Sequence, residues 1–201
     1  MNNCNCPAPT ALTDIPSENC GINMEQIQRV IFQRGQTDAP FDATDVLTLS
    51  AWQDYMAATD DTKTVITPLV GGDPIIEPGD AITTGGGDNS TLNGVEQLDG
   101  INPSKFSCFY NSLSSAQEKA LKKLICETNL TAYFVLQGGK IAIKKISTDV
   151  WGLAIQSFFI SDRGNSGYGT KDKFNVSFSL PAGWSEDMTI ITPSFNPLTE
   201  L

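Results

Sequence analysis

The chain has 201 residues, of which 40% are apolar and 18% charged, and it carries a net charge of -10 with no histidine. The apolar positions are spread along the chain, which argues against global disorder, and a chain of this size buries roughly 70% of its unfolded surface on folding. The missing histidine excludes Ser-His-Asp and Cys-His catalytic arrangements. The acidic charge cannot neutralise phosphates, so sequence-specific nucleic-acid binding is not expected.

The first 23 residues are polar and show no periodicity, so we expect an extended N-terminal arm (1–23) ahead of a single domain (24–201). This start has no apolar run typical of a secretory leader, and no stretch of ~18 apolar residues predicts a membrane span. Cys4, Cys6 and Cys20 supply three metal ligands and no histidine for a fourth, so no complete zinc site is expected. We expect free thiols, with a disulfide as the alternative.

The sequence pattern in the first half of the domain predicts two strands and a short helix. Alternation over Gln26–Arg34 indicates a strand. Over Asp45–Ala58 the apolar residues recur at i, i+3 and i+7, which predicts a short helix that places Trp52 in the core. Thr64–Val70 is β-branched but contains Pro68, which favours an edge strand.

Gly71–Asn102 is rich in Gly, Pro, Asp and Asn and predicts a long hairpin or loop insertion. Its short β-prone pieces have too few apolar side chains to form a core of their own. Their backbone groups need partners, which a neighbouring copy of the chain can supply. We therefore expect an intersubunit loop at its centre, made of Gly85, Gly86, Gly87, Asp88 and Asn89.

After a strand at Lys105–Tyr110, a capping box of Ser114 with Gln117 predicts the main helix, which ends before Asn129. Cys108 in the strand and Cys126 at the end of the helix are expected in the core. The apolar stripe of this helix is expected to face the β core and comprises Leu113, Ala116, Ala120, Leu121, Leu124 and Ile125.

The C-terminal third predicts five strands, the first two of which flank a Gly-Gly hairpin turn. They are Leu130–Leu136, Lys140–Ile146, Val150–Ile160, Lys173–Leu180 and Asp187–Thr192. The fold class that follows is mainly β (α+β): an antiparallel β-sandwich or partly closed barrel of roughly seven to nine strands, with one main and one short flanking helix.

No catalytic, cofactor-binding or metal-ligating residue is predicted, and we expect a protein that is not an enzyme. Most carboxylates lie beside Gly or Pro, where Asp typically serves turns, and no EF-hand spacing is present. The Gly-rich loops at Gly85–Ser90 and Arg163–Gly169 match neither the dinucleotide nor the Walker pattern, and no helix is expected to follow either.

The chain resembles virion structural proteins of tailed phages that infect Bacteroidota, including the crAss-like group. The resemblance lies in the start CNCPAP, the segments QIQRVIFQR and AWQDYMAA, the Gly-rich region and the ending from WGLAIQSFFISDRGNSGYG to ITPSFNPL. The predicted order of elements is also similar to that of tail-tube proteins. In that family a small β-sandwich with one helix assembles into stacked rings, and long loops bridge the subunits.

The resemblance implies a tail-tube or ring subunit that is made in the host cytoplasm and resides in the virion. Its expected partners are copies of itself and neighbouring virion proteins, with no membrane. A head–tail connector or a capsid decoration protein is the nearest alternative. An extracellular glycan-binding β-sandwich is the alternative from a different class, and it would need an export signal.

Overall fold

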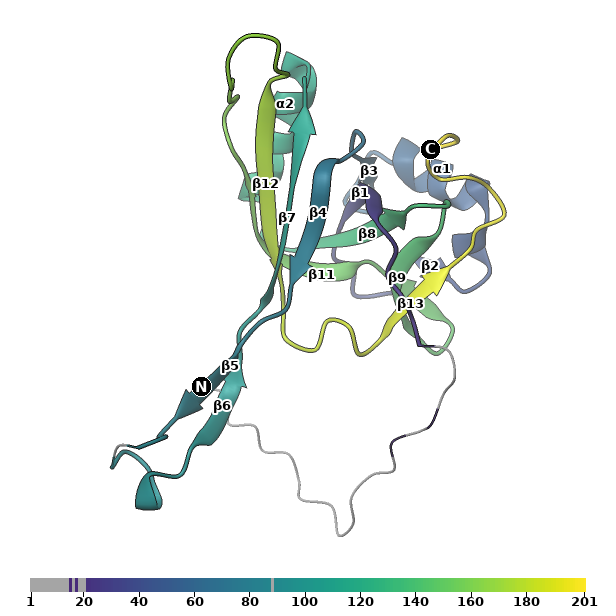
Figure 1. Cartoon of the computed structure of the whole chain (residues 1–201). Coiled ribbons are helices and arrows are strands. Elements are labelled where there is room, and N and C mark those ends of the chain that lie inside the picture. The colour runs from purple at the N-terminus through teal and green to yellow at the C-terminus, as the bar shows by residue number, and fades with distance from the viewer. Residues whose placement is uncertain (1–14, 16, 18–20, 88) are drawn as a thin grey trace.

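The computed structural model describes residues 15, 17, 21–87 and 89–201, and within them it confirms the mainly β fold class (Figure 1). The main sheet is antiparallel and curls into a half-barrel, and a separate two-stranded hairpin extends from it. The described strands outnumber the seven to nine expected from the sequence, because several are only two to four residues long. They are β1 (Ile27–Arg34), β2 (Phe41–Asp42), β3 (Thr64–Ile66), β4 (Gly71–Glu77), β5 (Ala81–Thr84), β6 (Gln97–Ile101), β7 (Ser104–Asn111), β8 (Leu130–Leu136), β9 (Ile141–Ile146), β10 (Asp149–Trp151), β11 (Leu153–Ile160), β12 (Lys173–Leu180) and β13 (Met188–Ile191). The helices are α1 (Leu49–Ala57) and α2 (Ser115–Lys123), with short 3₁₀ turns at η1 (Asp45–Leu47), η2 (Leu92–Gly94) and η3 (Leu124–Cys126).

Strand β8 is the centre of the first part of the sheet. All seven of its residues are buried, as its continuous apolar sequence LTAYFVL requires. It pairs with β1 along one side, and with β9 and the start of β11 along the other. Strand β3 pairs with β1 and ends before Pro68, which confirms the expected edge strand.

Strand β11 links the two parts of the sheet. Its first residues pair with β8, and from Gln156 onward it pairs with β12, with a bulge between Gln156 and Phe159 that contains Ser157, where φ is +54°. Strands β7 and β4 follow β12 outward, so β4 is the outer strand of this second part. A single strand was expected over Val150–Ile160, but Gly152 separates β10 from β11. A Cβ at Gly152 would lie 2.6 Å from the hydroxyl of Thr131, so the break between the two strands falls at a position where a larger residue does not fit.

The main core lies inside the curl of the sheet and is rich in phenylalanine. Phe178 of β12 stacks on Phe106 of β7 with their ring centroids 4.6 Å apart, and it also contacts rings from β1, β8 and β11. A second cluster on the other face of β8 is centred on Trp52 of α1, which is fully buried, as the sequence predicts. Its indole N–H donates to the carbonyl of Val46 at 2.9 Å.

Helix α2 begins with the predicted capping box, in which Gln117 N–H donates to Ser114 Oγ at 3.2 Å and Ser114 N–H donates to Gln117 Oε1 at 2.9 Å. The predicted stripe is only partly correct. Leu113 and Leu121 are buried and Leu124 is half-buried, because only this edge of the helix contacts the sheet. The other members of the stripe, Ala116, Ala120 and Ile125, are exposed, and so is Cys126. The prediction that these four residues lie in the core is therefore wrong. Cys108 is buried as expected.

Candidate functional site

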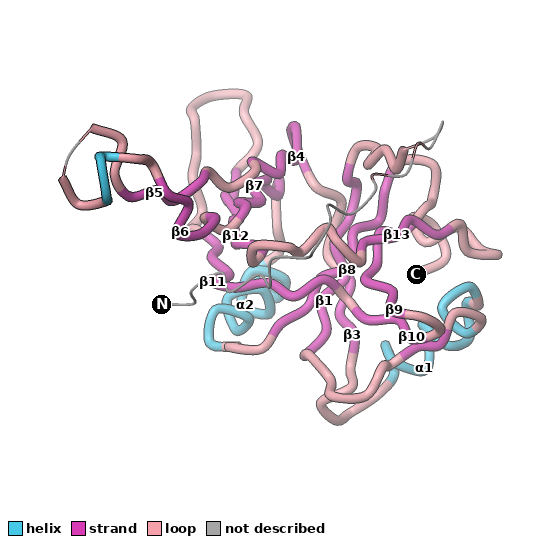
Figure 2. Tube along the Cα trace, turned by 90° about the horizontal axis from the view of Figure 1, so that it is seen from below, coloured by secondary structure: helices cyan, strands magenta, loops and turns pink. Residues whose placement is uncertain are grey.

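The most distinctive feature is the hairpin formed by β5 and β6, which projects away from the curled sheet (Figures 1 and 2). We call residues 78–103 the arm. The arm begins later in the chain than the predicted insertion, because β4, at Gly71–Glu77, belongs to the main sheet, where it pairs with β7. The two arm strands form a separate two-stranded sheet and pack mainly against each other. All four residues of β5 are exposed, and both faces of the ribbon are therefore open.

The arm exposes large apolar side chains that no core covers. A two-stranded hairpin alone is marginally stable in water, and its open faces are normally polar. Leu98 of β6 is 58% exposed and Ile82 of β5 is 44% exposed. The others are Leu92, Val95 and Ile101. This surface has the composition of one that a protein partner covers.

The tip of the arm contains the loop residues predicted from the sequence. Gly85, Gly86 and Gly87 have φ of +92°, +83° and +120°, and the N–H groups of Gly86 and Gly87 both donate to the carbonyl of Gly94, at 3.1 and 3.3 Å. A Cβ at Gly85 would lie 2.5 Å from the backbone carbonyl oxygen of Val95, so glycine is required at position 85. Asn89 is exposed, and Asp88 lies outside the described residues. The described part of the loop is therefore a hydrogen-bonded turn.

The root of the arm depends on Gly79, a residue that the sequence reasoning did not single out. A Cβ at Gly79 would lie 1.7 Å from the carbonyl oxygen of Asn102, so only glycine lets the two chains meet here. The N–H of Asn102 donates to the carbonyl of Asp80 at 2.8 Å and closes the root. The only signal in the sequence was the dipeptide Pro78-Gly79, which indicates a turn but not this close approach.

The arm is also uniformly acidic. Four acidic residues and no Lys or Arg occur between Pro78 and Pro103. They are Asp80, Asp88, Glu96 and Asp99. The hydroxyl of Thr84 donates to Asp99 across the ribbon. An acidic ribbon with apolar side chains is suited to a basic partner surface that also offers some apolar contact.

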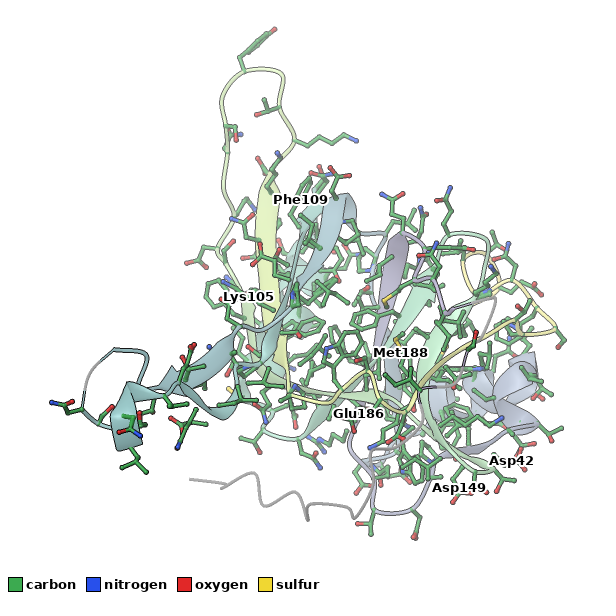
Figure 3. All side chains as sticks on the ribbon, turned by 60° about the horizontal axis from the view of Figure 1, so that its bottom comes forward. Asp42, Lys105, Phe109, Asp149, Glu186 and Met188 are labelled. Atoms are coloured by element: carbon green, nitrogen blue, oxygen red, sulfur yellow. The ribbon has the colours of Figure 1, made fainter. Side chains whose placement is uncertain are left out.

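A cleft of about 540 Å³ opens beside the arm root. Most of its lining is apolar, and the indole N–H of Trp184 at its wall donates to the hydroxyl of Ser104 at 3.1 Å. Figure 3 shows Met188, another lining residue, beside Glu186 on this underside of the molecule. The lining also includes Met24, Ile27, Pro74, Ile76 and Pro78.

At the far end of β7 from the arm, a network of ion pairs joins α2 to the loop between β11 and β12. Lys122 Nζ contacts Glu118 at 2.8 Å and Asp162 at 2.5 Å. Arg163 contacts Asp172 at 3.0 Å and Glu118 at 3.3 Å. The hydrogen bond from Lys122 lowers the pKa of both Glu118 and Asp162, so all the acids of this network are ionised at neutral pH. Each acidic group here already has a basic partner.

Every carboxyl group whose pKa is displaced, among the residues that the structure describes, has a lowered pKa, because each accepts hydrogen bonds. Asp42 accepts from the N–H groups of Asp45 and Thr44, which lowers its pKa, and it lies opposite Asp149 in the β2–β10 pair (Figure 3). Within the described part of the chain, no group of three His, Cys, Asp or Glu side chains is placed to hold a metal ion. No helix there is long and apolar enough to cross a membrane.

No family model and no curated protein matches this chain. A similar solved structure is a chain in the tail of an empty gene transfer agent (GTA) particle, refined with C6 symmetry; the TM-score is 0.35 and the identity 7%. The similarity covers 67% of this chain and 89% of that chain. None of these comparisons names a phage of Bacteroidota, so that part of the resemblance stays a prediction.

Proposed function

We propose that the chain is a structural subunit of a tailed-phage virion, a tail-tube or ring protein that assembles with copies of itself through the arm. The observation that carries this proposal is the arm: a two-stranded ribbon, open on both faces, that exposes Leu98 and Ile82 without any core of its own. Burial of such side chains against a neighbouring subunit would stabilise both the arm and the contact.

The phage context rests on the sequence resemblance described above. In that context the protein is made in the host cytoplasm and resides in the virion, with neighbouring virion proteins as further partners. The net charge of -10 suits a tube or ring around DNA, because an acidic wall repels the phosphates and lets the DNA pass without adhering.

Mass photometry and negative-stain imaging of the purified full chain test this proposal. We expect rings or short tubes for the wild type. Deleting Gly85–Asn93 should leave the far-ultraviolet circular-dichroism spectrum unchanged, because the backbone hydrogen bonds of Gly86 and Gly87 end on Gly94 within the arm, while assembly is lost. A wild-type chain that stays monomeric at every concentration would refute the proposal.

A pair of matched point variants separates the arm from a general loss of apolar surface. Val95→Ser with Leu98→Ser removes two side chains of the arm, each 58% exposed. Leu69→Ser with Ile146→Ser removes two side chains of similar exposure, 55% and 46%, from the body of the domain. Only the arm pair should abolish assembly, and equal effects of the two pairs would mean that the arm has no special role.

A further inference from the structure

The outer face of α2 is a basic surface in a protein whose net charge is -10. Ala116, Lys119, Ala120 and Lys123 are spaced by three or four residues, so they share one face of the helix, and all four are exposed. Neither lysine forms an ion pair among the described residues, whereas Lys122 on the adjacent face is held by two carboxylates. Two small side chains next to two lysines leave a positively charged surface on this helix.

This surface and the arm lie at opposite ends of one strand. The arm runs directly into β7 at Ser104, and α2 follows the other end of β7 at Asn111 (Figure 1). Eight residues of extended chain separate the two ends by roughly 25 Å, and the arm points away from α2. The arm of one copy therefore cannot cover α2 of the same copy.

We propose that the acidic arm of one subunit docks on the Ala116–Lys123 face of α2 in a second copy of this chain, head to tail. The charges are complementary: the arm has four acidic and no basic residues, and the helix face has two lysines that form no ion pair with any described residue. In this contact the exposed apolar side chains of the arm pack on the alanines, and the acidic side chains of the arm supply the charge opposite the lysines. Contacts between two different patches repeat from copy to copy, which produces a ring where the rotation closes and a filament where it does not. This inference rests on the proposed function and specifies its contact.

Charge reversal tests the contact. Lys119→Glu with Lys123→Glu makes the helix face acidic, and Glu96→Lys with Asp99→Lys makes the arm basic. Each variant alone should lose assembly by at least about tenfold in apparent affinity, because attraction becomes repulsion. A 1:1 mixture of the two variants should assemble again, since the basic arm of one fits the acidic helix of the other. The matched control, Lys63→Glu with Lys145→Glu, has the same change in net charge as the helix variant at residues outside the Ala116–Lys123 face and should assemble like the wild type.

Zero-length carbodiimide crosslinking of the assembled wild type provides a second measurement that does not depend on variants. In a mixture of isotope-labelled and unlabelled chains, we expect crosslinks between the α2 lysines and the arm carboxylates that join labelled to unlabelled copies. If the wild type assembles but these crosslinks are missing, or if the helix variant assembles like its control, the inference is wrong and the proposed function stands. If the wild type never assembles, the proposed function fails and the inference fails with it.

Discussion

Replacing Phe178 by alanine tests whether the main core and the Trp52 cluster unfold as one unit. Phe178 is 2% exposed, and it contacts the rings of Phe106, Phe134, Phe158 and Phe32, which come from four other strands. A buried Phe→Ala change costs about 3–5 kcal/mol, because both the transfer free energy and the contacts around the new cavity are lost. With a urea m-value of about 2 kcal/mol/M for a domain of this size, the midpoint should fall by about 2 M.

The assay follows urea unfolding with two single-tryptophan backgrounds. One retains Trp52 in the second cluster, and the other retains Trp184, which packs against the main core. If residues 24–201 form a single domain, Phe178→Ala should lower the midpoint by the same amount in both backgrounds, each compared with its own parent that retains Phe178. A Trp52 transition that stays at the position of its parent would refute this reasoning, because the clusters would then unfold independently. Phe159→Ala is the matched control: this ring is 52% exposed, so its loss should cost less than about 1 kcal/mol.

Three further predictions concern the arm root, α2 and an exposed ion pair. Gly79→Ala should displace the arm and abolish assembly in mass photometry, while the unfolding free energy of the core changes by less than about 1 kcal/mol. Assembly of this variant like the wild type would contradict the close approach of Gly79 to Asn102. Leu121→Ala should cost about 2–5 kcal/mol in urea unfolding, and Leu124→Ala distinctly less because Leu124 is only half-buried; equal costs would contradict this packing. The bidentate hydrogen bond from Arg34 lowers the pKa of Glu127, so this pair stabilises the fold above the unfolded pKa of Glu and the stabilisation is lost as pH falls through the lower folded value. Arg34→Gln should therefore make stability less dependent on pH between about 5 and 3, as measured by thermal melts across pH, and an unchanged acid limb would refute this.

The elements with one buried face were predictable from the sequence alone. Alternation over Lys173–Leu180 predicts β12 with the bounds observed, because each apolar residue there points into the core and each polar residue points out. The continuous apolar run of Leu130–Leu136 likewise predicts the buried β8. In both strands the local pattern and the tertiary environment agree.

Features that depend on a distant partner were not predictable. The helical pattern shows that Ala120 and Leu121 lie near each other on α2. It does not show that the sheet buries Leu121 and leaves Ala120 exposed. The break at Gly152 depends on how close Thr131 comes. At the candidate site, the glycine turn of the arm is evident from composition. The root of the arm is not evident from composition. Glycine is required at position 79 because the backbone of Asn102, 23 positions later, lies against it, and the local sequence pattern does not show that these two residues meet.

The direct continuation of the arm into β7 has a mechanical consequence. A pull on the arm from a neighbouring subunit acts along the axis of β7, which is held to β12 by a ladder of eight residue pairs. Such a load shears these hydrogen bonds together instead of peeling them one at a time. From β12 the load passes into β11, whose bulged strand is bonded to both parts of the sheet, and then into the buried β8. Resistance to force is governed by the unfolding rate. This strand order should therefore slow the rupture of a subunit under tension, even where its equilibrium stability is modest.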